Sequence, residues 1–444
     1  MFLPDLTLHV LLRKPNMKQA IMYTVIAAWL SLSTAAAAAA AENPQPRWWK
    51  GNLHTHSFWS DGNDFPDMIA AWYVEHGYDF LALSDHNILA RGDKWVELDK
   101  NKPDREIAEA IRKYRAKFGP SWVEEQTDGD KTRVRLKPLV EYRTRFERPD
   151  EFLMIEGEEI TDAYKELPVH LNASNLRELI PPQGGNSVYE VMQRNVDMVL
   201  AQRTLAGRPI LVHLNHPNFR WGVTAEDLAK VRGERFFEVY NGHPGVFNYG
   251  DANHPSAERM WDIILARRLV KTDGEIMFGL ATDDSHEYHE YRVGKVNPGR
   301  GWVMVRAVHL TPEAIINAME RGDFYATTGV EISQIKRTSH SLSFTIANEP
   351  GVTYKTQFIG TELQHDGNSE PRLDADGKPA YITRRYSKDI GKVLAETDST
   401  RPSYTFTGRE IYVRATVVSS RPHPNGFAKD DLETAWIQPV IPPR

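Results

Sequence analysis

The sequence predicts an α/β fold followed by a smaller antiparallel β region, and three observations support this prediction. Short, nearly continuous apolar runs recur and end in ionisable residues, which is typical of parallel strands covered on both faces. Amphipathic segments lie between these runs, so strands alternate with helices as in an α/β sheet or barrel. After residue 332 the pattern changes to short alternating stretches separated by turn residues, which indicates antiparallel strands.

The individual elements follow from these patterns. The expected strands are FLALSDH (80–86), FLMIEGEEIT (152–161), ILVHLNHP (210–217), FFEVYNG (236–242) and IMFGLATDDSH (276–286). Helices are expected at 65–76, 104–118, 188–206, 256–268 and 312–321. The late strands are expected within SLSFTIAN, YKTQFIG, AYITRRY, EIYVRATVV and TAWIQPVI. Residues 88–150 interrupt the alternation, and we interpret them as an insertion that is either a lid over the site or a solvated surface excursion.

The first 41 residues have the layout of a secretory signal. Lys18 precedes an apolar stretch at 21–32, and small residues continue to Ala41. The apolar stretch is shorter than the ~20 residues that a membrane-spanning helix needs. We therefore expect a cleaved signal peptide at 1–41, with Met17 as a possible true start, and an exported chain that is periplasmic or secreted. The predicted domains are then a catalytic region at 47–330, with its insertion at 88–150, and a small β-sandwich-like domain at 331–444.

Composition excludes several kinds of site. The 444 residues are 41% hydrophobic and 26% charged, as in an ordinary globular protein. The chain has no cysteine, which excludes disulfides, thiolate metal sites and cysteine nucleophiles. A net charge of −6 argues against nucleic-acid partners, which need a basic surface. The expected partner is a small molecule, and the sequence does not give the oligomeric state.

Ligand-type residues collect at the ends of the apolar runs. In GNLHTHS the two histidines are two residues apart, so on a strand both face the same side. The candidate metal ligands are His54, His56, Asp61, His86, Glu159, His170, His216, Asp284 and His286. A lone histidine at a strand end is usually a hydrogen-bonded core or surface residue, so the prediction depends on the whole set. Such side chains suit zinc, manganese or iron.

Three neighbours of these ligands are assigned other roles. His213 lies three residues before His216, so strand alternation sends it to the opposite side, where we expect it to pack or to support the site. Asp283 lacks the two-residue spacing to His286 that Asp284 has. Asp85 is expected to orient His86 or a neighbour, as carboxylates behind metal ligands often do.

The ordered motifs resemble the PHP (polymerase and histidinol phosphatase) family of metal-dependent hydrolases over roughly residues 48–329. The motifs are GNLHTHSFWSDG, LSDHN, EGEEIT, VHLNA, NHPN and DDSH. HPNF, EVYNGHP and FYATTGV are similar to the exported, carbaryl-hydrolase-type branch. The resemblance implies a distorted (βα)7 barrel with two or three divalent ions. His54, His56, Glu159 and Asp284 would hold the first ion, and Glu159, His170 and His216 the second. Asp61, His86 and His286 would hold the third, although Asp61 stands where relatives can have histidine.

Such a centre predicts a hydrolase, most simply a phosphoesterase that cleaves phosphate mono- or diesters with metal-bound hydroxide at the first-ion residues. The alternative is a carbamate, ester or amide hydrolase of carbaryl-hydrolase type, since the same nucleophile attacks carbonyl carbon. A third hypothesis is a non-catalytic, metal-stabilised ligand-binding module. The positive charge of the bound ions would exceed the negative charge of the carboxylate ligands, so we expect an anionic substrate. Weak candidates for proton donor or anion clamp are His243, His289 and Arg292.

Overall fold

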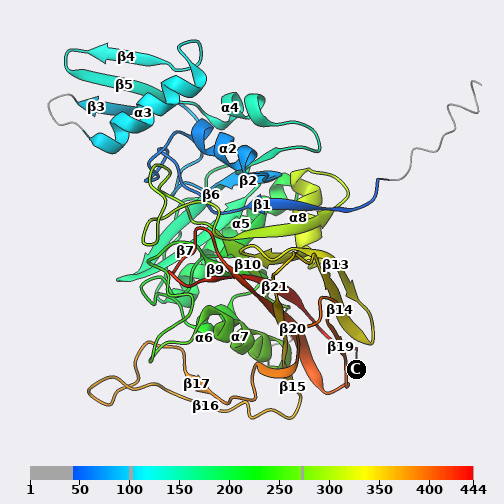
Figure 1. Cartoon of the computed structure of the whole chain (residues 1–444). Helices are drawn as coiled ribbons and strands as arrows, with labels where there is room; N and C mark the ends of the chain where they lie inside the picture. Colours follow the sequence, from blue (N-terminus) through cyan, green and yellow to red (C-terminus); the bar gives the residue numbers. More distant parts are fainter. Residues whose placement is uncertain (1–43, 100–103, 272–274, 444) are drawn as a thin grey trace, which may run out of the picture. The chain divides into compact units, whose positions relative to one another are not determined.

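The computed structural model describes residues 44–99, 104–271 and 275–443. The chain divides into two units, Met1–Pro46 and Arg47–Arg444, and the elements below belong to the second (Figure 1). The predicted signal peptide lies outside the described residues. Within the described part, no helix is both long and apolar enough to cross a membrane.

A large mixed sheet of 13 strands is the main feature of the fold. In sheet order the strands are β10 (Phe278–Thr282), β9 (Phe236–Asn241), β8 (Leu211–Leu214), β7 (Leu167–Ser174), β6 (Leu153–Tyr164), β2 (Phe80–Leu83), β1 (Arg47–Asn52), β11 (Trp302–Ala307), β12 (Phe324–Thr327), β21 (Leu432–Val440), β20 (Glu410–Pro422), β15 (Tyr354–Glu362) and β18 (Lys392–Thr397). The pairs β1–β2, β2–β6, β8–β9 and β9–β10 are parallel. The protein is therefore a mixed α/β fold, as the sequence predicts.

One strand of this region runs against the others. β7 pairs antiparallel with both β6 and β8, whereas the five strands expected from the apolar runs share one direction. The cause is a tight β6–β7 hairpin in which Lys165 adopts a left-handed backbone conformation with φ of 56°. Connections of two residues join antiparallel strands, and parallel strands need a long crossover. His170 therefore lies within a returning strand and not at a strand end.

The chain beyond β1 also meets the chain beyond β10. Thr55 and Ser285 form an isolated parallel bridge. The backbone N–H of Asp284 donates to His54 O, and that of His56 donates to Ser285 O, both at 2.9 Å. These contacts bring the first and last histidine motifs of the sequence side by side.

The five predicted helices are present, and α4 and α6 are two that the sequence analysis did not name. They are α2 (Pro66–Glu75), α3 (Arg105–Phe118), α4 (Leu139–Phe146), α5 (Val188–Ala206), α6 (Ala225–Lys230), α7 (Ala257–Lys271) and α8 (Pro312–Glu320). The α5 helix begins after Ser187, whose side chain accepts from Glu190 N, and ends at Gly207 with φ of 61°. Apolar residues of α5, α6 and α7 pack with those of β7, β8 and β9 in one buried core.

The predicted insertion contains more structure than the expected helix. Besides α3 and α4, it forms a three-stranded antiparallel sheet in the order β3 (Lys94–Asp99), β5 (Lys131–Leu136) and β4 (Glu125–Asp128). The β4 strand is exposed along its length, so no alternation of apolar and polar residues marks it in the sequence.

The late strands are antiparallel, as expected, and they divide between sheets. β13 (Ile332–Arg337), β14 (Ser341–Ile346) and β19 (Ser403–Thr405) form a small sheet, and β16 (Ser369–Glu370) pairs with β17 (Arg385–Tyr386). β15, β18, β20 and β21 extend the large sheet through the β12–β21 pair. Of the stretch AYITRRY, only its last two residues are paired. The domain boundary near residue 330 stays a prediction.

Candidate metal centre

Ligand-type side chains from separate strands meet at the carboxyl ends of the parallel strands. His54 and His56 follow β1, His86 follows β2, His216 follows β8, and Asp284 and His286 follow β10. Glu159 and His170 belong to the paired strands β6 and β7, and Asp61 lies in the loop before α2. The structure thus brings all nine predicted ligands into overlapping groups, each small enough to surround an ion.

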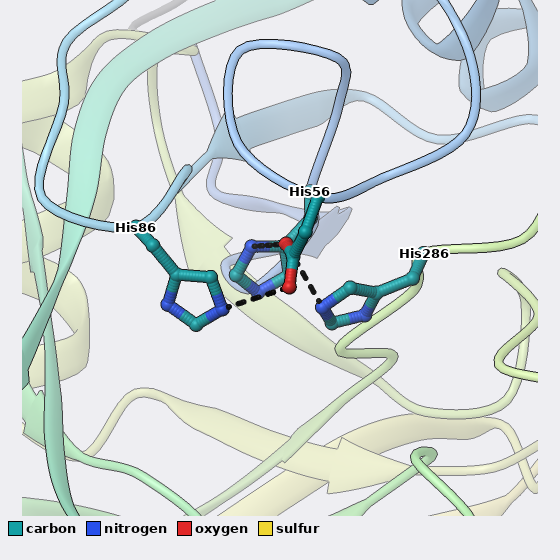
Figure 2. Close-up of side chains that lie close together, drawn as sticks. His56, His86 and His286 are labelled. Carbon is teal, nitrogen blue, oxygen red and sulfur yellow. Dashed lines mark ion pairs between the residues drawn. The ribbon is translucent and has the colours of Figure 1, made fainter.

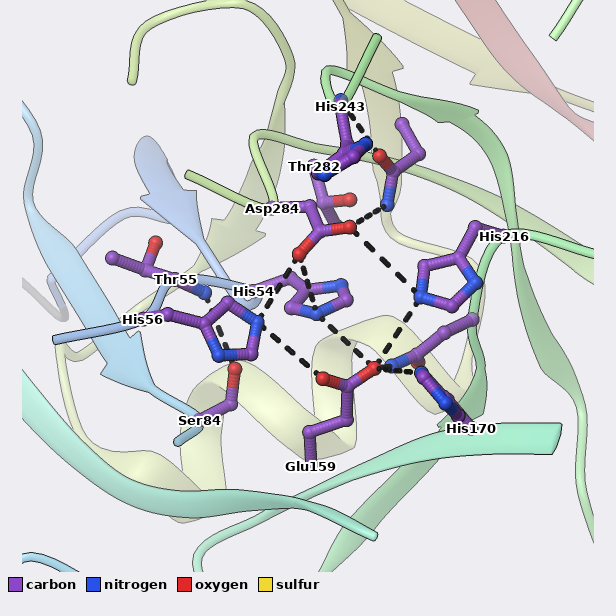
Figure 3. Close-up of polar contacts among 12 residues, drawn as sticks. His54, Thr55, His56, Ser84, Glu159, His170, His216, His243, Thr282 and Asp284 are labelled. Atoms are coloured by element: carbon purple, nitrogen blue, oxygen red, sulfur yellow. Dashed lines mark hydrogen bonds and ion pairs between the residues drawn. The ribbon is translucent and has the colours of Figure 1, made fainter. Parts of the chain in front are cut away.

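The inner group is built on two buried carboxylates (Figure 3). His54 Nε2 and His56 Nε2 each lie 3.1 Å from Asp284 Oδ1. They lie 3.5 and 3.4 Å, respectively, from the two oxygens of Glu159. Ligand atoms bound to one tetrahedral zinc ion are separated by about 3.4 Å. These four side chains therefore have the spacing of ligands around a single ion.

Glu159 is shared with a second set of histidines. His170 Nδ1 lies 3.0 Å and His216 Nε2 lies 3.3 Å from Glu159 Oε1. His216 Nε2 also lies 3.9 Å from Asp284 Oδ2. A carboxylate with histidines on both oxygens is placed to bridge two ions.

The outer group consists of Asp61 and the three histidines that Figure 2 labels, His56, His86 and His286. His286 Nε2 and His56 Nδ1 lie 3.4 and 3.7 Å from Asp61 Oδ1, and His86 Nε2 lies 3.5 Å from Asp61 Oδ2. His86 Nδ1 is also 2.8 Å from Glu159 Oε2, so this group adjoins the inner one. The Asp61 side chain is 57% exposed, in contrast to the buried carboxylates.

The inner residues fit a bound cation because their facing atoms lack hydrogen-bond partners. His54 Nε2, His56 Nε2 and Glu159 Oε2 are buried and make no hydrogen bond within the described part of the chain. A buried polar atom without a partner costs about 1–3 kcal/mol. Two imidazole nitrogens and a carboxylate oxygen that face one another are the donor set of a divalent ion.

Electrostatics keep the inner carboxylates charged. Burial alone raises a carboxyl pKa, but His54 and the neighbouring imidazoles hold the pKa of Glu159 and of Asp284 well below the usual range. Burial lowers the pKa of His86, yet Glu159 and Asp61 outweigh burial and raise it to about 10. Without a cation, protons on the imidazoles balance the carboxylates, so ion binding will release protons.

Glu238, which the sequence analysis did not select, supports the inner histidines. It is 1% exposed, and its Oε1 accepts hydrogen bonds from His54 Nδ1 at 2.7 Å and Thr282 Oγ1 at 2.8 Å. Its Oε2 accepts from His216 N and Asn241 Nδ2, both at 2.8 Å. The available signal was a carboxylate in the middle of the apolar run FFEVYNG. Such outer partners fix the tautomer and orientation of metal-binding histidines.

The three neighbours of the ligands have structural contacts. Asp283 accepts from Tyr73 Oη and from three successive backbone N–H groups, beginning at Gly299. Asp85 accepts from the backbone and hydroxyl groups of both Ser57 and Ser60, so it orders the loop after His56. His213 is fully buried, with Nε2 3.4 Å from Glu238 Oε1.

The weak candidates are placed differently. The His243 ring lies 5.6 Å from the His286 ring, and Figure 3 shows His243 near Asp284. His289 Nε2 donates to Asn63 O at 2.9 Å, and its Nδ1 lies 3.1 Å from Lys113 Nζ. Arg292 is exposed and pairs with Glu290. Of the three, only His243 has a ring contact with a predicted ligand among the described residues, and the roles of all three stay predictions.

Comparisons with known proteins give no sequence match. No protein-family model and no curated protein matches the chain. One similar solved structure is a two-domain protein from Bacteroides vulgatus ATCC 8482 that contains a predicted PHP-like metal-dependent phosphoesterase. It has 14% identity and a TM-score of 0.36, over 89% of this chain and 96% of that one. Another, assigned as a metal-dependent phosphoesterase from Bifidobacterium adolescentis ATCC 15703, has 14% identity and a TM-score of 0.27, over 57% and 91%. Likenesses at this level carry no functional argument, so the function is inferred from the geometry of the site.

Proposed function

We propose that this chain is a metal-dependent hydrolase of the PHP type that cleaves phosphate mono- or diesters. The observation that carries the proposal is the convergence of nine histidine and carboxylate side chains at one edge of the sheet, with buried ligand atoms that lack hydrogen-bond partners. A structural zinc site needs four ligands and closes around its ion. Overlapping groups that share Glu159 exceed that need and favour catalysis.

The proposed fold of the catalytic region is a distorted seven-stranded barrel. β1, β2, β6, β7, β8, β9 and β10 pair in sequence, and the Thr55–Ser285 bridge supports closure of the ring. In barrel enzymes the carboxyl ends of the strands carry the chemistry. The ligand groups lie at this end of the parallel strands.

The first ion would be held by His54, His56, Glu159 and Asp284, and the second by Glu159, His170 and His216. Asp61, His86 and His286 would hold the third. Bound divalent ions supply a water of lowered pKa and positive charge that stabilises the oxygens of a displacement. Glu238 accepts the Nδ1 hydrogen of His54, so that His54 Nε2 faces the centre as an acceptor. Asp284 and Glu159 stay ionised through the facing imidazoles, which keeps their oxygens available as ligands.

His243 is proposed to donate a hydrogen bond to the oxygen of the leaving group. Its Nδ1 accepts from Gly245 N at 2.8 Å, which leaves the hydrogen of the neutral ring on Nε2. Burial lowers its pKa to about 4, so the ring is neutral at pH 7. A neutral imidazole does not give up this proton at pH 7, so His243 would keep it while it hydrogen-bonds the leaving group, and the leaving group would take its own proton from water.

The test is a substrate panel on the full chain reconstituted with zinc or manganese. We expect metal-dependent hydrolysis of nitrophenyl phosphate or its diester, inhibited by phosphate. Asp284→Asn should reduce kcat/KM by more than about 100-fold, because even outer-shell partners cost 10- to 100-fold. The exposed Asp366→Asn is the matched control and should behave as the wild type.

Other outcomes of this panel decide between the alternatives. Turnover of naphthyl acetate or carbamates with little phosphatase activity would replace the proposal by a carbonyl hydrolase of carbaryl-hydrolase type. Tight ion binding with no turnover would favour a non-catalytic module. Full activity in Asp284→Asn would exclude the proposed centre.

Export and a small anionic substrate, without a nucleic-acid partner, complete the proposal. The secretory-signal layout of residues 1–41 supports export, and the net charge of −6 argues against a nucleic-acid partner. Mass spectrometry of the protein from a cell fraction outside the inner membrane should find an N-terminus near residue 42. A full-length chain retained in the cytoplasm would contradict export.

A further inference from the structure

Asp61 depends on its loop more than any other member of the metal centre. It is the only carboxylate of the outer group, which otherwise consists of His56, His86 and His286. The three histidines follow paired strands, whereas Asp61 lies in the turn between His56 and α2. Its carboxylate accepts a hydrogen bond from the adjacent Ser60 hydroxyl at 3.2 Å and lies 3.4–3.7 Å from nitrogens of the three histidines. The backbone of Asp61 is therefore placed by the contacts that hold residues 57–64, and from there its carboxylate reaches the three histidines.

Two groups of hydrogen bonds hold the ends of this loop. Asp85 accepts from Ser57 and Ser60 at the start of the loop, with the shortest contact 2.6 Å from Ser60 Oγ. Asn63 N donates to His286 O at 2.8 Å near its end. Both groups belong to the catalytic region itself.

The third anchor is Trp59, which reaches into the insertion. Trp59 is 2% exposed and packs in a buried cluster whose other members include Ala110, Ile111, Tyr114 and Phe118 of α3 and Val134 and Leu136 of β5. Its indole Nε1 donates to Lys137 O at 3.3 Å. The carbonyl of Trp59 accepts from Lys94 Nζ at the start of β3. An indole buried at this depth fixes the backbone two residues before Asp61.

We propose that the insertion positions Asp61 through Trp59 and so determines whether the outer ion binds. Trp59 is a positioning residue, because its side chain packs in the buried cluster and bonds to Lys137 O, and not to the predicted ligands. The inner ions depend on Glu159 and Asp284, which lie on β6 and directly beyond β10 and not in this loop. The insertion thereby controls the outer ion separately from the inner ones. This inference rests on the proposed metal centre.

The experiment measures ion binding and not activity. The ion-free full chain is titrated with Zn²⁺ by calorimetry, and the bound metal is counted by elemental analysis after dialysis. Asp61→Asn should lose the weakest class of ion. Trp59→Ala should weaken that same class by at least tenfold and leave the tighter classes unchanged. Trp59→Phe keeps an apolar ring in the cluster but loses the Nε1 contact with Lys137 O, so it should weaken the same class by a smaller factor.

A double variant separates positioning from general destabilisation. If Trp59 acts through Asp61, Trp59→Ala should add nothing to the effect of Asp61→Asn on the outer ion. Trp95→Ala removes a tryptophan of the same insertion whose indole donates to Asp93, and it should bind ions as the wild type does. The visible spectrum of the Co²⁺-loaded protein should show loss of one ligand set in Asp61→Asn and in Trp59→Ala alike.

The results that overturn the inference are specific. Wild-type affinity for every ion in Trp59→Ala would remove it, as would equal weakening of all ion classes or additive effects in the double variant. If Trp59→Ala does not fold, the Trp59→Phe titration decides: a weakened outer-ion affinity with intact inner ions supports positioning by the indole and its Lys137 contact. An affinity equal to that of the wild type, together with an unchanged Co²⁺ spectrum, then counts against it. A wild-type chain that binds no ion would instead refute the proposed function.

Discussion

Replacing Glu238 by glutamine should weaken the inner metal centre without removing a ligand. Each oxygen of Glu238 accepts two hydrogen bonds: His54 Nδ1 and Thr282 Oγ1 on one, His216 N and Asn241 Nδ2 on the other. In Glu238→Gln an NH2 group replaces one of these oxygens. Two buried hydrogen-bond donors then face another donor instead of an acceptor. Loss of such outer partners typically lowers metal affinity 10- to 100-fold, or about 1.4–2.7 kcal/mol.

The assay is Zn²⁺ binding measured by competition with a chromophoric chelator at pH 7. The matched control is Glu234→Gln, in a residue that is equally buried and lies just before β9. Burial raises the pKa of Glu234 to about 8, so this carboxyl is mostly protonated at pH 7 and an amide resembles it. The control should keep wild-type affinity. An affinity of Glu238→Gln within twofold of the wild type would refute the role assigned to these hydrogen bonds.

Three further outcomes are expected. Burial raises the pKa of Glu158 from 4.5 to about 8, so the folded state holds a proton that the unfolded chain releases. The contribution of Glu158 to the free energy of unfolding is therefore lost as pH rises from about 4.5 to about 8, by at most about 1.4 kcal/mol per pH unit. Denaturant titrations should show a smaller loss of stability between pH 5 and pH 8 in Glu158→Gln, and parallel curves would contradict the shift. Asp262→Ala should cost about 3 kcal/mol in the same titrations, because the buried Arg414 guanidinium loses the carboxylate that it contacts at 2.8 Å and keeps only Glu258, at 3.0 Å. Glu109→Ala, in an exposed pair, is the control for it, and equal stability losses in the two variants would contradict this reasoning. Removal of ions by a chelator should lower the midpoint of thermal unfolding and take up protons, which a weakly buffered titration at constant pH measures; an unchanged midpoint would show that the folded state binds no ion.

The sequence identifies ligand-type residues well because each belongs to a short apolar run or follows one. The pairs His54–His56 and Asp284–His286 are visible as motifs, since a two-residue spacing in an extended chain places both side chains of each pair on one face. Glu238 is not visible in this way. It lies inside β9 between the apolar residues Phe237 and Val239, and only its long-range contact with His54 reveals its role.

Non-local pairing explains most of the remaining differences. The apolar runs give the direction of five strands correctly, but the β6–β7 hairpin depends on a tight turn at Lys165 rather than on hydrophobic periodicity. The exposed β4 strand carries no apolar pattern. The late strands join the large sheet through β12 and β21, which are separated by more than 100 residues. No local pattern encodes a pairing across that distance.

The β6–β7 hairpin makes the centre sensitive to changes in loop length. Thr161 pairs with His170, and Glu159 pairs with Asn172, so the turn alone sets which residues stand opposite each other. Successive residues of a strand point to opposite faces. An insertion or deletion of a single residue at Lys165 would turn the imidazole of His170 away from Glu159 while leaving the sequence of every motif intact. Homologues with longer hairpins should therefore differ by even numbers of residues here, or obtain this ligand from another strand.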